Sequence, residues 1–145
     1  MSRSDGVTKA MAVIGTVLTW IPLAFAILLS LGASLSDRGF RFDWLLPAEL
    51  FPLVLAGGLL LLWAAARAHR LLRPIAVTLV VLVAVLVGGQ ALAVASGLAD
   101  GRLQTSGWQW TTVVASIALY TVGVIVLGVL GLRLARDLWS TRSVF

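Results

Sequence analysis

Asp43 and Glu49 are the two acids of this 145-residue chain whose types and spacing could support chemistry as a pair. They stand six residues apart in a segment between two apolar runs. Two carboxylates that converge can bind a cation or act in acid–base catalysis. Spacing alone does not bring the two carboxylates together. Acids in such segments are usually hydrated residues that flank a membrane span and bind nothing. Asp43 and Glu49 therefore stand as a hypothesis for a site on the outer face of a membrane.

Other chemically versatile residue types are scarce. The chain has no cysteine, which excludes disulfides, thiolate metal sites and thiol redox chemistry. His69 is the single histidine and lies among Arg67, Arg70 and Arg73. One histidine cannot build a metal site or a bis-histidine haem site without partners, so we interpret His69 as a solvated turn residue. The sequence thus predicts no catalytic, cofactor-binding or metal-binding site, and no enzyme.

Four windows without a charged residue or a histidine organise the chain, and they cover residues 10–36, 50–66, 74–99 and 103–132. About 20 apolar residues, rising about 1.5 Å each, cross the hydrocarbon of a bilayer as a helix. We therefore predict transmembrane helices at about 10–31, 47–66, 74–99 and 109–132, an outer interfacial segment at 32–46 and a turn at 67–73. The first run exceeds the apolar core of a signal peptide, about 7–15 residues, so we expect it to be retained.

Basic residues are distributed unequally between the two sides that four spans define. Eight of the eleven fall beside the termini and in the 67–73 turn, which holds Arg67, Arg70 and Arg73. The other three are Arg38, Arg41 and Arg102. Because positive residues collect in the cytoplasm, both termini should be cytoplasmic. The predicted fold class is an all-α integral membrane protein, one domain of four antiparallel helices. The dominance of Arg, Ala, Val, Leu and Gly suggests a GC-rich bacterial genome, hence an inner membrane.

Small residues recur at helical spacing within the predicted spans. The first span carries a small face made by Ala12, Gly15, Thr19, Ala26 and Ser30. The third carries Ala84, Gly88, Ala91 and Ala95, and the fourth includes Gly123. Lipid tails are as apolar as Leu, so helices in membranes associate where small residues let their backbones approach. These faces are predicted to be helix-packing surfaces.

Gln90 is the most polar side chain inside the third predicted span, and it points away from the small face of that span. An amide without a partner in hydrocarbon costs several kcal/mol. We therefore expect Gln90 to form a hydrogen bond within the membrane. Thr19, Ser116 and Tyr120 are the candidates within the chain, and a contact with another subunit is the alternative.

The interiors of the predicted spans contain no Asp, Glu, Lys, Arg or His side chain, whereas proton relays and coupled transporters ordinarily depend on one. The chain also lacks the acid in the first span that small multidrug exporters need. We predict a non-enzymatic accessory or partner-binding subunit of a membrane assembly. Its partners would be the lipid bilayer and either further copies or another membrane protein. Basic residues flank spans, so nucleic acid is not an expected partner.

Two alternatives remain open at this point. A small oligomeric channel or transporter could form around Gln90 and the hydroxyl groups of the fourth span. A lipid-modifying enzyme at the outer face would have to use Asp43 and Glu49.

Overall fold

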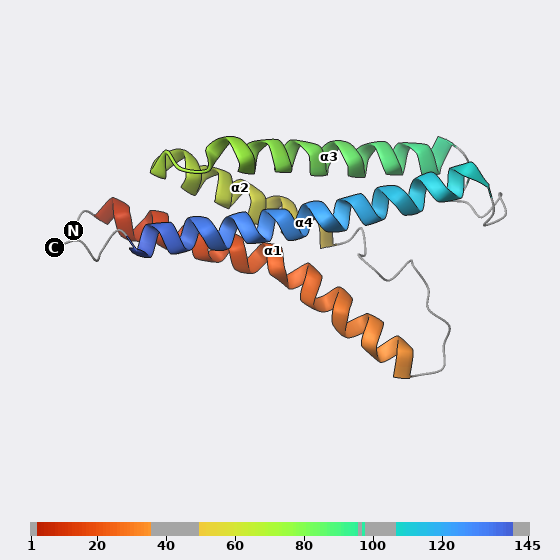
Figure 1. The fold of residues 1–145 in the computed structure, drawn as a ribbon, viewed down its shortest axis with the longest axis horizontal. Helices are drawn as coiled ribbons and strands as arrows, with labels where there is room; N and C mark the ends of the chain where they lie inside the picture. The colour runs from red at the N-terminus through yellow and green to blue at the C-terminus, as the bar shows by residue number, and fades with distance from the viewer. Residues whose placement is uncertain (1–2, 36–49, 96, 98–106, 141–145) are drawn as a thin grey trace.

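The computed structural model describes residues 3–35, 50–95, 97 and 107–140, which form four α-helices (Figure 1). The helices are α1 (Arg3–Leu35), α2 (Phe51–Ala68), α3 (Leu72–Ala95) and α4 (Trp108–Ser140). All four are long and apolar enough to cross a membrane. The prediction of an all-helical, multi-pass membrane protein is confirmed to this extent.

The helix ends differ from the predicted spans for local reasons. α4 continues to Ser140 rather than ending near residue 132, because the fully buried Leu134 extends its packed face beyond the apolar window. α2 begins at Phe51 with Pro52 in its first turn, where the missing N–H of proline removes no helical hydrogen bond. Three other parts of the predicted spans lie outside the described residues, namely 47–49, 96 and 98–99.

A tight turn joins α2 to α3. His69 and Leu71 have φ angles of 51° and 55°, in the left-handed region. The N–H of Arg70 donates to the carbonyl oxygen of Ala65 at 3.2 Å, and the N–H of His69 donates to that of Ala66 at 3.4 Å. These bonds close the carboxyl end of α2. The turn lies at the same end of the molecule as the start of α1 and the end of α4 (Figure 1).

α1 and α2 cross at a pair of glycines, Gly15 and Gly57. A Cβ atom on Gly15 would lie 2.9 Å from the carbonyl oxygen of Gly57 and 3.1 Å from the backbone nitrogen of Leu61. A Cβ atom on Gly57 would lie 2.9 Å from the carbonyl oxygen of Gly15. Real Cβ atoms essentially never approach so closely, so both backbones require glycine here. The crossing gains dispersion contacts that larger side chains would prevent.

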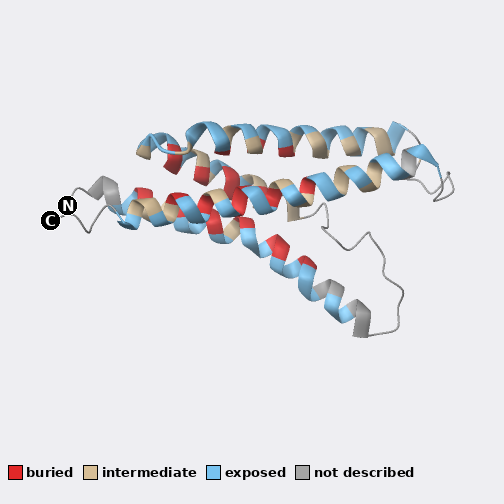
Figure 2. Ribbon diagram, viewed as in Figure 1, coloured by how far each residue is buried: buried red, intermediate tan, exposed pale blue. Residues whose placement is uncertain are grey.

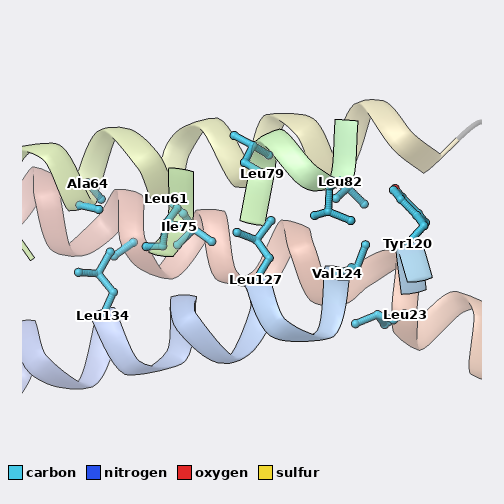
Figure 3. Packing of buried hydrophobic residues seen from close by; sticks show 13 residues of the cluster. Leu23, Leu61, Ala64, Ile75, Leu79, Leu82, Tyr120, Val124, Leu127 and Leu134 are labelled. Carbon is cyan, nitrogen blue, oxygen red and sulfur yellow. The ribbon is translucent and has the colours of Figure 1, made fainter. Parts of the chain in front are cut away.

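At several other helix contacts a glycine of one helix lies against a side chain of another. Gly131 of α4 lies against Thr16 of α1, and Gly123 of α4 lies against Leu82 of α3. Leu61 of α2 is fully buried, and its side chain lies about equally close to Gly15 and Gly131. Figure 3 shows Leu61 among other buried side chains, including those of Ile75, Leu79, Leu82, Val124, Leu127 and Leu134.

The second half of α1 diverges from the other helices (Figure 1). Pro22 lies inside α1 and is buried, and its missing N–H leaves the carbonyl oxygen of Leu18 without its usual helical donor. Beyond Pro22 the side chains of Phe25, Ile27 and Leu28 are exposed, and Figure 2 shows this exposure along the diverging half. This part of α1 presents large apolar side chains of the kind that suit lipid tails.

The Gly15–Gly57 crossing predicts opposite effects for two glycine-to-alanine changes in α1. Gly15→Ala should destabilise the protein by about 1–3 kcal/mol, because the new methyl group meets backbone atoms that cannot move independently. Gly32→Ala should be neutral or stabilising by up to about 1 kcal/mol, because a Cβ there meets nothing within 4 Å and alanine favours helix. Unfolding in mild detergent, followed by circular dichroism, measures both. Equal stability of the two variants would contradict the crossing.

Candidate functional site

The candidate acids Asp43 and Glu49 lie outside the described residues, so their pairing stays a prediction. Within the described part of the chain, no group of three or more histidine, cysteine, aspartate or glutamate side chains could hold a metal ion. The His69 side chain is exposed, and its backbone provides the left-handed cap of α2. That placement agrees with the interpretation of His69 as a turn residue.

The polar residues proposed as internal partners for Gln90 have other surroundings. The hydroxyls of Thr19 and Ser116 each donate to the carbonyl oxygen four residues earlier in their own helix, at 2.8 and 2.9 Å. Tyr120 is buried, and its ring lies tilted against that of Phe51 with centroids 6.5 Å apart. Thr19 and Ser116 therefore satisfy their hydroxyls locally, and Tyr120 packs in the core.

Gln90 is exposed on α3, and its amide forms no hydrogen bond with any residue that the structure describes. The expectation of a bond to Thr19, Ser116 or Tyr120 is therefore not met within the chain. Gln90 lies about 10 Å along the axis from the middle of α3, at about 1.5 Å per residue. The hydrocarbon extends about 15 Å to each side of its midplane, so the Gln90 amide lies within it if α3 is centred there.

The small face of α3 is exposed as well. Ala84, Gly88, Ala91 and Ala95 all point away from the core, and a Cβ on Gly88 would meet nothing within 4 Å. The sequence predicts a packing surface, but these four residues are exposed in the described chain rather than packed against its core. Figure 2 shows the exposure along the side of α3 that faces away from the other helices. Gly123, by contrast, packs against α3: a Cβ there would lie 2.7 Å from Leu82.

We define the outward face of α3 as its exposed residues from Val77 to Ala95 other than Gln90. They are Val77, Val80, Val81, Ala84, Val87, Gly88, Ala91, Val94 and Ala95. No side chain of this face is larger than valine. The exposed residues of α1 include Ile14, Phe25 and Leu28, so small size is not general to the exposed surface. Gln90 lies at the flank of this face, beside Val87 and Val94 and turned away from Gly88, because residues three and four apart in a helix are neighbours. The outward face of α3 and Gln90 at its flank form the candidate functional surface.

Cations and indole rings pair at the end of the molecule that holds the α2–α3 turn. The guanidinium carbon of Arg67 lies 4.7 Å from the ring centroid of Trp63, and Lys9 Nζ lies 6.0 Å from that of Trp139. The spacing of Trp63 and Arg67, four residues apart in one helix, could have predicted the first pair. The second joins α1 to α4, and no sequence pattern identifies those two helices as neighbours.

Comparisons with protein-family models, with curated proteins and with solved structures find no match to this chain.

Proposed function

We propose that this chain is a non-enzymatic subunit that joins a larger membrane assembly through the outward face of α3. The observation that carries the proposal is Gln90, whose amide is exposed and lacks a hydrogen-bond partner among the described residues. With α3 centred in the bilayer, this amide would lie within the hydrocarbon. A neighbouring transmembrane helix that supplies a polar group would remove the cost of leaving this amide in hydrocarbon.

The composition of the outward face supports a helix rather than lipid as its neighbour. Gly88 with Ala84 and Ala91 provides the small-residue spacing at which two backbones approach in membranes. The valines beside them have few rotamers to lose on contact, so ordering them costs little entropy. α3 is also the least buried of the four helices, which leaves most of its circumference available.

The free energy of a hydrogen bond from Gln90 to a partner helix would be small. Hydrogen bonds between membrane helices contribute about 0.6–2 kcal/mol, which biases association without producing it alone. Close packing along the outward face of α3 would have to supply the remaining free energy of association. The partner is a second copy of this chain or a helix of another membrane protein, and mass spectrometry of the isolated complex separates these cases.

The orientation belongs to the same proposal. Both termini and the α2–α3 turn would lie in the cytoplasm of a bacterium, with the four helices antiparallel in its inner membrane. The supporting observation is the excess of basic residues on that side, eight of eleven in the sequence. Arg67, Arg70 and Arg73 account for three of the eight.

Reporter fusions test the orientation. Alkaline phosphatase should be active when fused after Asp37 or Gln104 and inactive when fused after Arg70 or Arg142, because it folds only outside the cytoplasm. A cytoplasmic reporter fused at the same four positions should give the reverse pattern. An active phosphatase fusion at Arg70 would overturn the orientation.

Substitutions on α3 test the association. Gly88→Leu should weaken complex formation by about 1–3 kcal/mol through overpacking. Gln90→Leu should weaken it by about 0.6–2 kcal/mol through the lost hydrogen bond. Neither change should lower the melting temperature of the isolated chain, because both positions are exposed within it. Native gels of mildly solubilised membranes, with mass spectrometry of the bands, measure the complex and identify the partner.

Val17→Leu on α1 is the matched control. Val17 is also exposed within a candidate membrane span, but it does not belong to the outward face of α3. It should leave the complex unchanged. The proposal would be contradicted if both α3 variants formed the complex as the wild type does. It would also be contradicted if Val17→Leu weakened the complex as much as the α3 variants do.

A further inference from the structure

We infer that the α2–α3 turn binds the headgroup of an anionic phospholipid in preference to a zwitterionic one. The basic site consists of Arg67 at the end of α2, Arg70 in the turn and Arg73 in the first turn of α3. The inference depends on the placement of the four helices in a membrane, but not on the outward face of α3.

The charges of the basic site are not neutralised within the described protein. Arg67, Arg70 and Arg73 are exposed, and none forms an ion pair with a described carboxylate. The acids of the helix ends on this side of the molecule are Asp5 in α1 and Asp137 in α4 (Figure 1). Asp137 has a partner other than Arg67, Arg70 and Arg73. An anion from the surroundings is therefore the available counter-charge.

The contact between Arg67 and Trp63 fixes the depth of this charge. Indole rings concentrate at the membrane–water interface, and Trp63 is exposed there with Arg67 over its ring at 4.7 Å. A guanidinium over an indole can still offer in-plane N–H groups, which match two phosphate oxygens at once. Arg67 is thus held at the level where lipid phosphates lie, and not beyond it in bulk water.

The exposed side of α2 also fits the apolar part of a lipid. Leu59, Trp63 and Arg67 follow one another at intervals of four residues and are all exposed. They therefore form a continuous stripe, with apolar side chains toward the middle of α2 and the guanidinium at its end. A phospholipid has the same order, with acyl chains inside and phosphate at the surface. This match favours a lipid over a free phosphate ion.

The backbone of the turn that carries the three arginines within seven residues has a defined conformation. The bond from the Arg70 N–H to the carbonyl oxygen of Ala65 and the left-handed His69 and Leu71 define one turn conformation. The first turn of α3 contains no acidic residue, so no side chain offsets the positive end of its helix dipole. Both features favour a negative headgroup.

Native mass spectrometry of the purified full chain tests the inference. Phosphatidylglycerol and phosphatidylcholine with identical acyl chains are added in turn, and the lipid adducts are counted. The wild type should prefer phosphatidylglycerol. Replacing Arg67, Arg70 and Arg73 with glutamine should reduce that preference by about fivefold for each arginine removed at low salt.

The matched control replaces Arg38, Arg41 and Arg102 with glutamine. Both triple variants change the formal net charge from +5 to +2, so a difference between them reports position rather than total charge. The control should keep the preference of the wild type. Equal loss in the two variants, or no preference in the wild type, would overturn the inference.

Two further measurements distinguish loss of lipid binding from misfolding, and lipid binding from binding of any free anion. If the glutamine triple loses helicity, the single change Arg70→Gln should still lower the preference about fivefold, and an unchanged preference would count against the site. Glycerol phosphate should not displace phosphatidylglycerol at equal concentration. Displacement at equal concentration would identify a general anion site and contradict the lipid assignment. The complexes tested through Gly88 and Gln90 are a separate readout, so the two proposals fail independently.

Discussion

The backbone contact between Gly15 and Gly57 is the constraint on which the rest of the bundle depends. In lipid there is little hydrophobic drive for one helix to join another, so the gain must come from close packing. Each glycine costs about 1 kcal/mol of helix propensity relative to alanine. The short distances at this crossing let many backbone atoms contribute dispersion at once, which offsets that cost.

The same close approach determines which surfaces remain available. With α1 held against α2, Leu61 fills the space between Gly15 and Gly131, and α4 is drawn to the same centre. α3 attaches at the side through Leu79 and Leu82, which meet glycines of α2 and α4. Its opposite side is left with valine, alanine and glycine. A protein held together at glycines thus keeps a further small-residue helix face exposed, with Gln90 at its flank. Our proposal assigns this face and the amide of Gln90 to a neighbouring helix.

The sequence predicts the number and approximate limits of the helices because uncharged windows of spanning length are physically restrictive. It also predicts the buried face of α1, where Ala12, Gly15 and Thr19 pack inside. The sequence could not predict that the small-residue face of α3, which contains Gly88, lies on the outside of the bundle. Helical spacing identifies which residues share a side, but inward and outward sides of a membrane helix are both apolar, so the pattern does not say what each side contacts. The outer acids lie outside the described residues, and their convergence remains a prediction.

Photo-cross-linking in native membranes tests the central claim most directly. Benzoylphenylalanine at Val80 or Val94 on α3 can be compared with the same group at Leu28 on α1, since these side chains are 67%, 67% and 66% exposed in the isolated chain. Illumination should give a protein adduct of defined mass from the two α3 positions and only lipid adducts from Leu28. Lipid adducts alone from all three positions would contradict a partner at the outward face of α3.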